Sequence, residues 1–586
     1  MASPIKSNMG LPSFTILVGG SDVGAKYGII SIRITKELNR VSRAQFFVSD
    51  GDPFEETFEV SSKNIFEPNK IVSIKLGYDQ VEKEVFSGII TGQSLRVNNS
   101  KSELVVNCMD KAFQMALVRK SQNFAKKKDS DVISQIIGTY GLSKSVKATT
   151  FKHPNLVQYN CSDWDFVLSR ADANAMVLIN EDGKIDIAPP VVSGSAVLDI
   201  SFGKEVLGFK ADMDAQNQLG AVEFQSWDGQ TMKLVKGAGS EPSVNAHGDL
   251  TGKKISATAK SPKLALNSSA PEESSLLKLW AKSHLQHSRL SKITGFVSFL
   301  GNALPKVGKL IKLEGFSPHF NGTAYLTKVI HEFDNGFWKT ETGFGLNPKT
   351  YTDGEKIEGP DALGLLPPIS GTHIGKVKKM DKDPAGEYRV QVDVPFIENS
   401  GEGLWARLSH RGFYIIPDIG DEVVLSFINN DPRFAVIIGS LYSKKNKPPF
   451  TPEKKNKDKA IVTKNKLKMT FDDDKKSIFI ETPGGQKITL DDKGKSLKLE
   501  DQNKNSVLLD KNGITFNSGK DLIFKSKSKI TMKSGAVTEI KSGADLKMAG
   551  KNLALKGTSK ATVQAATVEV KGSSKVKLKG GAVNIN

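Results

Sequence analysis

Hydrophobic side chains recur in pairs along the last 76 residues, with one residue between the two members of each pair. The pairs follow one another every seven or eight residues. An inward, outward, inward alternation predicts short strands rather than a helix. The ten repeats are Ile514/Phe516, Leu522/Phe524, Ile530/Met532, Thr538/Ile540, Leu546/Met548, Leu553/Leu555, Ala561/Val563, Val568/Val570, Val576/Leu578 and Val583/Ile585.

Glycines stand between most of these pairs. The prediction is that they take the positive φ that a tight corner needs, which would make the segment a β-solenoid. These glycines are Gly519, Gly535, Gly543, Gly550, Gly557, Gly572 and Gly580.

Such a segment is not expected to fold as one chain. Ordering eight residues costs roughly 1–2 kcal/mol of backbone entropy each, more than two small buried side chains return. Three chains wound together would each supply one wall of a prism and pair their edges with the next chain. We therefore predict a homotrimeric β-helical needle. Its core is formed by every paired side chain named above except Thr538 and Ala561.

The outer positions of the needle are rich in lysine. Residues 511–586 carry fifteen Lys, no Arg and four acidic residues, so their net charge is +11, out of +18 for the whole chain. Phe516 and Phe524 are the only aromatic residues of this segment. Nucleic-acid binders usually add Arg and aromatic residues to a basic stripe. The pattern therefore favours lysines that keep strand edges soluble, and it leaves attraction to an anionic membrane surface open as a secondary role.

The composition is that of a globular protein. Its 586 residues are 38% hydrophobic and 25% charged, which predicts three or four domains. Two cysteines, Cys108 and Cys161, give no disulfide framework, so folding in a reducing cytosol is expected. Met1 to Ser13 lacks a signal pattern, and no apolar run approaches the ~20 residues of a membrane span. We expect assembly in the cytoplasm, with other components moving the protein out of the cell.

Alternating strands with turn signals dominate residues 14–109, helices follow, and strands return after about Arg289 and run to Gly345. Strands are predicted at Ile71–Leu76, closed by Gly77, and at Val85–Ile90. Helices are predicted from a cap at Asp129/Ser130 to Gly141, from the capping box Ser162–Asp165 to Ala171, and from Pro271 to about Arg289. Asp182-Gly183 indicates a hairpin turn between Ala175–Ile179 and Lys184–Ile187. Residues 228–270 are interpreted as long hairpins or a mobile crossing.

Five short β-segments within about 70 residues predict a small barrel of the oligonucleotide/oligosaccharide-binding (OB) type. They are Gly375–Val377, Tyr388–Val392, Leu404–Arg407, Ile416–Val424 and Ile438–Tyr442. The segments lack the aromatic platform that nucleic-acid binding needs, and Trp405 and Tyr442 are interpreted as packing residues. Asp421 and Glu422 are interpreted as turn and strand-start residues.

Catalytic and metal-binding motifs are absent from the sequence. There is no phosphate-binding loop, nucleophile elbow or Cys-x-x-Cys. His284 and His287 share one helix face and could bind a metal, but without a nearby carboxylate a solvated face is favoured. No catalytic residue, cofactor or metal is expected, and the chain is not expected to be an enzyme.

Several strings resemble the VgrG and contractile-phage tail-spike family. Val72–Asp79 with Val85–Gly92 is similar to the hub of that family, and Asn160–Phe166 to the helix after its central insertion. Phe320–Leu326 looks like its second barrel. Pro417-x-x-Gly-Asp-Glu-Val and Asp431-Pro-x-x-x-x-Ile-x-Gly are the most specific matches, and Ile478–Gly485 resembles the neck of a VgrG needle.

The resemblance implies a mainly β protein with the following parts. Residues 1–352 would form a hub of two tube-like β-barrel domains with helical insertions, and 353–368 a linker. Residues 369–443 would form the OB-fold barrel, 444–460 a connector, and 461–586 a neck and an intertwined trimeric β-helix. The expected function is the trimeric central spike of a contractile injection system, either type VI secretion or an extracellular phage-tail-like particle. It would cap the inner tube and puncture the target envelope to deliver effectors. A trimeric receptor-binding or adhesion fibre, a prophage baseplate spike and an enzyme-bearing spike are the alternatives.

The expected partners are two further copies of the chain, a hexameric inner-tube protein at the hub end, baseplate proteins and effector cargo. The target membrane would be met transiently, and no nucleic acid is expected. A tip protein of the PAAR-repeat kind is expected to dock on Val583, Asn584, Ile585 and Asn586.

Overall fold

The computed structural model describes residues 10–98, 101–260, 262–397 and 402–585. The predicted mainly β class is confirmed. The chain divides into two compact units, Met1–Ser440 and Leu441–Asn586. Within the described ranges, no helix is long and apolar enough to cross a membrane.

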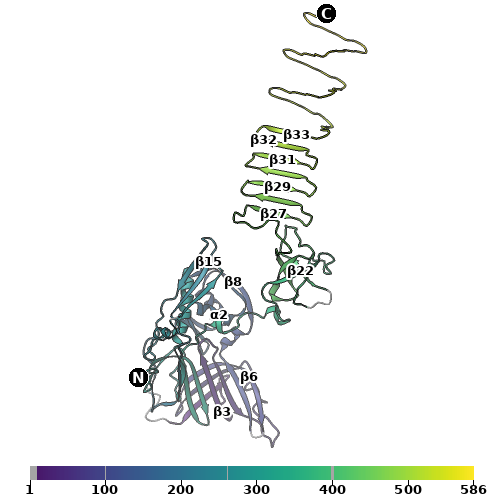
Figure 1. The fold of residues 1–586 in the computed structure, drawn as a ribbon. Helices are drawn as coiled ribbons and strands as arrows, with labels where there is room; N and C mark the ends of the chain where they lie inside the picture. Colours follow the sequence, from purple (N-terminus) through teal and green to yellow (C-terminus); the bar gives the residue numbers. More distant parts are fainter. Residues whose placement is uncertain (1–9, 99–100, 261, 398–401, 586) are drawn as a thin grey trace. The chain divides into compact units, whose positions relative to one another are not determined.

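A long sheet runs through the first unit (Figure 1). Its first half is formed by strands of residues 12–109 and its second half by strands of residues 199–344. Its two halves join where β3 and β20 pair antiparallel, from Glu37 opposite Lys328 to Ser31 opposite Asp334. In sheet order the strands are β14 (Val206–Met213), β18 (Ile293–Leu300), β21 (Phe337–Phe344), β20 (Gly322–Asp334), β3 (Ile29–Glu37), β4 (Arg43–Ser49), β7 (Lys101–Met109), β6 (Val81–Asn98), β5 (Ile71–Tyr78), β1 (Pro12–Val18) and β2 (Ser21–Asp22). β13 (Asp199–Ser201) and β19 (Leu310–Glu314) pair with each other, and β19 also pairs with β20.

Alternation along these strands creates one hydrophobic core in each half. In β4, Ala44, Phe46 and Val48 are buried while the residues between them are partly exposed. The predicted strands at Ile71 and Val85 are present, but β5 does not stop at Gly77. The turn lies at Asp79-Gln80, where both residues take positive φ.

A helical insertion lies between the two halves in the chain and packs around its own core. Its elements are η1 (Lys111–Ala116), β8 (Arg119–Lys128), α1 (Asp129–Gly138), β9 (Ser143–Val146), β10 (Lys152–Ser162), α2 (Asp163–Ala173), β11 (Val177–Glu181) and β12 (Lys184–Ala188). Ser162 caps α2 by accepting from the Asp165 amide, as predicted. The predicted cap of α1 is wrong, because Lys128 is the N-cap and the Asp129 carboxylate is buried against Arg170.

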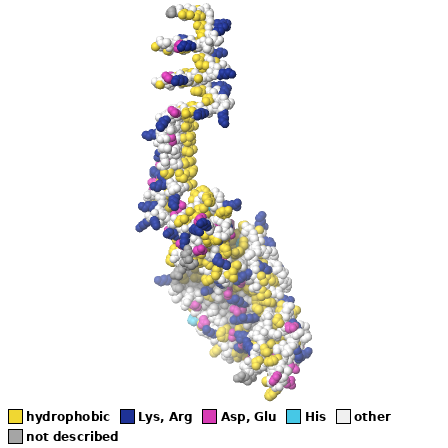
Figure 2. Space-filling model, turned by 90° about the vertical axis from the view of Figure 1, so that its right-hand side faces the viewer, with side chains coloured by type: hydrophobic (Ala, Val, Ile, Leu, Met, Phe, Trp, Pro, Cys, Tyr) yellow, Lys and Arg dark blue, Asp and Glu magenta, His cyan; other side chains and the backbone are white. Residues whose placement is uncertain are grey.

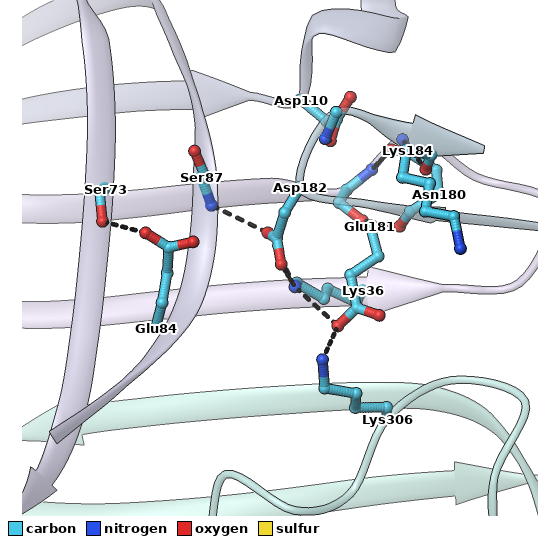
Figure 3. Close-up of polar contacts among 12 residues, drawn as sticks. Lys36, Ser73, Glu84, Ser87, Asp110, Asn180, Glu181, Asp182, Lys184 and Lys306 are labelled. Carbon is cyan, nitrogen blue, oxygen red and sulfur yellow. Dashed lines mark hydrogen bonds and ion pairs between the residues drawn. The ribbon is translucent and has the colours of Figure 1, made fainter. Parts of the chain in front are cut away.

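The predicted hairpin turn ties this insertion to the sheet (Figure 3). Asp182 and Gly183 both have positive φ, and the Asp182 carboxylate accepts from Lys36 Nζ at 3.0 Å and from the Ser87 amide at 2.9 Å. Neighbouring Glu181 pairs with Lys306 at 2.9 Å. Burial alone would raise the pKa of Glu181, but the lysines hold it below its usual range. The hairpin thus connects β3 and β6 of the first half with the loop between β18 and β19 of the second half.

Residues 228–260 and 262–270, interpreted above as long hairpins or a mobile crossing, contain strands and short helices. A small sheet, β16-β15-β17, packs on a long helix. These elements are β15 (Ala221–Asp228), β16 (Lys233–Ala238), α3 (Gly252–Ser256), η2 (Ala257–Ala259), β17 (Lys263–Ser268) and α4 (Ser274–Leu290). The hairpin β15–β16 is present as expected, and β17 adds a parallel pairing to β15.

A closed barrel follows α5 (Tyr351–Gly354) and η3 (Asp361–Gly364), and the predicted OB-type barrel is confirmed. Its strand order is β22 (His373–Lys379), β23 (Val390–Asp393), β24 (Leu404–Leu408), β26 (Ala435–Ser440) and β25 (Glu422–Phe427), with η4 (Ile428–Asn430) before β26. Asp421 accepts from the Asp418 amide in the turn before β25, as expected. Tyr442 is 70% exposed and follows β26, so it does not pack in the barrel core of the single chain as predicted.

The second unit begins with antiparallel strands that each pair with the next, drawn as stacked rungs in Figure 1. They are β27 (Asp458–Val462), β28 (Lys468–Asp472), β29 (Ser477–Glu481), β30 (Lys487–Asp491), β31 (Ser496–Glu500), β32 (Ser506–Asp510) and β33 (Gly513–Asn517). The first repeat, Ile514/Phe516, is therefore the last strand of this sheet. Residues 518–585 continue as bends and extended chain without strand pairing.

Candidate functional site

One face of the β27–β33 sheet is formed almost entirely by hydrophobic side chains. The register places Met469 opposite Ile480, Ile480 opposite Ile488, Ile488 opposite Leu499 and Leu499 opposite Val507. Because side chains alternate along a strand, every second residue joins this face. We call it the apolar face: Ile461, Met469, Phe471, Ile478, Ile480, Ile488, Leu490, Leu497, Leu499, Val507, Leu509, Ile514 and Phe516.

The opposite face is mostly polar and carries balanced charge. Lys468 on β28 pairs with Glu481 on β29 at 3.2 Å, and Lys498 pairs with Glu500. The Lys498 ammonium holds the pKa of Glu500 below its usual range. The sheet therefore has one face suited to water and one that is not.

Nothing in the described chain covers the apolar face. Ile488, Leu499 and Phe516 are 37%, 41% and 53% exposed, and a groove of about 550 Å³ runs along them. Figure 2 shows a continuous hydrophobic band along this part of the chain. An exposed hydrophobic surface of this extent marks an interaction site. A single copy of the chain is thus incomplete at this face.

The hydrophobic band continues into the repeats after β33. Phe524 contacts Phe516 edge to face at 6.3 Å between ring centroids, so the second repeat lies on the same side as the apolar face. This contact extends the apolar face beyond the last paired strand.

The predicted needle core is not buried in the single chain. Its side chains are at least half exposed, from 50% at Val576 to 83% at Ile585. The physical reason is that residues 518–585 form no paired strands within one chain, so no second wall lies opposite them. The exposed members are Ile514, Phe516, Leu522, Phe524, Ile530, Met532, Ile540, Leu546, Met548, Leu553, Leu555, Val563, Val568, Val570, Val576, Leu578, Val583 and Ile585.

Burial of these side chains therefore stays a prediction about the assembled protein. The most exposed of them, such as Leu555 at 74% and Val563 at 75%, have the most surface to lose on assembly. Val583 and Ile585, assigned to tip docking, are exposed as well. Asn586, also assigned to tip docking, lies outside the described residues.

Serines shape the first corners between repeats. Ser526 Oγ accepts from the Ser528 amide and donates to the Lys529 carbonyl oxygen, both at 3.2 Å. The same two hydrogen bonds are made by Ser518, Ser534 and Ser542. Each Oγ accepts from the amide two residues later and donates to the carbonyl oxygen three residues later. A side chain that bonds the backbone two residues on is a recognised turn-forming device. The corner is therefore set by a hydroxyl group.

The predicted role of the corner glycines is wrong. None of the seven, all of which the structure describes, takes a positive φ. At Gly557 and Gly572 a Cβ would lie 2.6 and 2.7 Å from the carbonyl oxygen three residues on, so these glycines permit a close backbone approach. At Gly535 and Gly543 nothing lies within 4 Å of a Cβ. Glycine is required at some corners for space rather than for backbone conformation.

On α4 His287 is buried and His284 is half-buried, so the favoured interpretation of a solvated face is wrong. His287 Nε2 lies 2.8 Å from Asp172 Oδ1, and His287 Nδ1 lies 2.8 Å from the Asn347 carbonyl oxygen. Burial would lower the pKa of His287, but Asp172 raises it above its usual value. His284 faces the Phe224 ring. Among the described residues no group of three His, Cys, Asp or Glu side chains could hold a metal ion.

Sequence reasoning missed the larger part of the apolar face. The neck was predicted within residues 461–586 without core residues of its own, and the predicted needle core begins at Ile514. The alternation was visible in Met469-Thr470-Phe471 and Ile478-Phe479-Ile480. Phe479 and Leu508 interrupt that alternation because they lie on the polar face.

Three family models match consecutive parts of the chain. The model described as the Alg8 N-terminal domain matches residues 8–335, more than half of the chain. The type VI secretion system/phage-baseplate injector OB domain matches residues 373–442. The phage baseplate V C-terminal trimerisation domain matches residues 477–559, which include most of the apolar face.

Individual relatives match less extensively. The actin cross-linking toxin VgrG1 of Vibrio cholerae is 38% identical over 80 residues, 12% of this chain and 7% of the toxin, so the chain spans a small part of that relative's length. The tail protein from Neisseria meningitidis MC58 is 12% identical over 58% of this chain and 98% of its own, with a TM-score of 0.44. The E. coli c3393 protein, a type VI secretion component, is 14% identical over 73% of this chain and 99% of its own, with a TM-score of 0.35.

The order of the matched families agrees with the order of the parts in the structure. A sheet-rich N-terminal region precedes a closed barrel, which precedes a sheet whose uncovered face lies in a trimerisation domain. The chain belongs to the family of the Alg8 N-terminal domain, and its barrel and second unit match an injector OB domain and a trimerisation domain of the phage baseplate.

Proposed function

We propose that three copies of the chain bury their apolar faces against one another and form the rod of a spike that caps an inner tube and is driven through a target envelope. The observation that carries this proposal is the continuity of uncovered hydrophobic side chains from Ile461 to Ile585. A chain that exposes this surface alone would aggregate, whereas a threefold arrangement encloses it.

The spike acts as a mechanical part. The sheath supplies the work of contraction, and the rod supplies stiffness, because antiparallel strands stacked around a closed core leave few free edges. The barrel and the second unit match families of baseplate and injector parts, and among the described residues no group of three His, Cys, Asp or Glu side chains could hold a metal ion. We propose that the chain itself is not an enzyme and that any toxic activity belongs to cargo.

The first unit is proposed to seat the spike on a hexameric tube. Each chain contributes two sheet halves, joined in one chain by the β3–β20 pairing. Three chains then present six such halves to the six subunits of a tube ring. The long strands of both halves are supported by separate cores, which suits two similar contact surfaces.

A tip protein of the PAAR-repeat kind is proposed to contact Val583, Asn584 and Ile585. Val583 and Ile585 are 53% and 83% exposed, and their inward positions continue the pattern of the rod. A partner that covers these side chains would bury hydrophobic surface and pair strand edges. Assembly in the cytoplasm followed by export within the particle completes the proposal.

Leu508 and Leu509 provide a matched test of this function. They are neighbours of the same type on β32, but the register places Leu509 on the apolar face and Leu508 on the polar face. Leu509→Asp should abolish trimer formation, incorporation into particles and delivery of cargo, whereas Leu508→Asp should retain them. Equal behaviour of the two variants would contradict the assignment of the apolar face to the rod interior.

An adhesion fibre is the alternative that the same trimer would allow. It would bind target cells without a sheath, so purified trimer would adhere to cells in the absence of other particle components. The spike proposal expects no such adhesion and expects cargo delivery to require contraction.

A further inference from the structure

The charge of the second unit changes sharply along the chain. Residues 458–510 contain eleven Lys and ten acidic residues, a net charge of +1, whereas residues 511–585 contain fifteen Lys and four acidic residues, a net charge of +11. Both segments expose much of their surface to water and both must remain soluble. The first segment meets that need with balanced charges, so solubility alone does not explain why the second keeps lysine almost by itself.

Many of these lysines occupy one position of the repeat. In six of the ten repeats a lysine directly follows the second inward side chain, and we call this set the lysine column. Its members are Lys525, Lys533, Lys541, Lys556, Lys571 and Lys579. All six are exposed. Figure 2 shows basic side chains at the margins of these turns of chain, away from the hydrophobic band.

Carboxylates neutralise only part of the lysine column. Lys541 pairs with Glu539 at 2.7 Å and Lys571 pairs with Glu569. Within residues 511–585 the structure records no ion pair for the other four members, Lys525, Lys533, Lys556 and Lys579. The repeat thus displays ammonium groups at regular intervals on the outside of the rod, with few internal partners.

We propose that the lysine column binds the anionic phospholipid headgroups of the target membrane, which deepens the proposed spike function and rests on it. A lysine held close to an anionic bilayer strengthens binding about fivefold, and the attraction is screened by salt. Several column lysines face the bilayer together as the rod enters the headgroup layer. Contacts of this kind form and break quickly, which suits a rod that has to keep moving.

The side chains of this segment favour lipid over nucleic acid. It contains no Arg, whose planar fork recognises phosphates in nucleic acids, and its two aromatic residues lie on the hydrophobic side. Base stacking on outward aromatic rings is therefore absent from residues 511–585. Ammonium groups on flexible stems at regular intervals match a fluid array of headgroup phosphates, which can rearrange to meet them.

The test uses the full-length chain and two variants with the same net charge. The column variant replaces Lys525, Lys533, Lys556 and Lys579 with Gln. The control variant replaces Lys464, Lys475, Lys493 and Lys504, which are exposed on the β27–β33 segment, with Gln. Co-sedimentation is measured with vesicles of phosphatidylcholine alone and with about one-third phosphatidylglycerol, at low and high salt, and duplex DNA is tested as a competitor.

The wild type and the control variant should bind the anionic vesicles but not the phosphatidylcholine vesicles, and this binding should be lost at high salt. The column variant should bind the anionic vesicles at least about tenfold more weakly. Equal binding by the two variants, absence of binding by the wild type, or tighter binding to DNA than to vesicles would overturn the proposal. Light scattering and a cargo-delivery assay on the same variants separate the two ideas. A trimer that delivers cargo but ignores anionic vesicles rejects the lipid contact alone, whereas failure to form a trimer rejects the spike.

Discussion

Ile530 and Thr531 allow the inward and outward sides of the repeats to be distinguished with one introduced residue. Ile530 is 57% exposed in the single chain and is predicted to become buried on assembly, while Thr531, the next residue, is predicted to lie on the outer side. Burial of a whole side chain of this size contributes about 1.5–3 kcal/mol. Burial of the exposed part of Ile530 therefore contributes about 1–2 kcal/mol in each chain, and about 3–5 kcal/mol in the trimer. Ile530→Asp forfeits this and brings three carboxylates together near the axis, each costing several kcal/mol to desolvate.

The assay is resistance of the purified trimer to guanidinium, followed by light scattering and by circular dichroism. Ile530→Asp should lower the midpoint strongly and release monomers at concentrations where the wild type remains trimeric. Thr531→Asp adds the same charge in the same repeat and should leave the midpoint nearly unchanged. If the two variants behave alike, or if Thr531→Asp is the more damaging, the assigned register is wrong.

Three further predictions concern corners, pH and the inserted hairpin. Ser526→Ala removes two hydrogen bonds from a corner and should destabilise the rod by about 1–3 kcal/mol per chain, whereas Gly535→Ala, with free space at Cβ and no positive φ, should be nearly neutral in the same guanidinium titration. Because Asp172 raises the pKa of His287 above 6.5, their pairing stabilises the fold below that pH and is lost as pH rises through the folded pKa. The difference in Tm between wild type and His287→Gln should therefore shrink on raising the pH, and a constant difference would argue against an ionic pairing. Asp182→Asn leaves the buried Lys36 ammonium with Glu181 as its one carboxylate partner and should lower the free energy of unfolding by about 1–3 kcal/mol, read from thermal unfolding, whereas unchanged stability would show that the hairpin is held by packing.

Short local signals in the sequence predicted local structure well. The Asp182-Gly183 turn, the Ser162 cap and the five barrel strands each depend on residues close together in the chain. The fold class followed from them because strand alternation repeats through most of the sequence. The Asp129 cap failed for a different reason: its partner Arg170 lies 41 residues away, and a buried ion pair outweighs a local capping tendency.

The candidate site was predicted only in part, because the sequence pattern shows local repeats but not contacts between residues that are distant in the chain. Its repeats were evident because each pair of hydrophobic residues is local. The corners were misassigned because glycine and serine both signal turns, and only the coordinates show that the serine hydroxyl makes the bonds. His287 was placed on a solvated face because its carboxylate partner, Asp172, is 115 residues away in sequence.

The mass of the intact protein in solution tests the central claim most directly. Light scattering at micromolar concentration should give about 191 kDa, three times the 63.6 kDa of one chain. The Leu509→Asp variant, measured beside it, should not reach this mass, because its carboxylates would lie inside the rod. A stable monomer or dimer of the wild-type chain would contradict the account, because the apolar face would then have no copies to cover it.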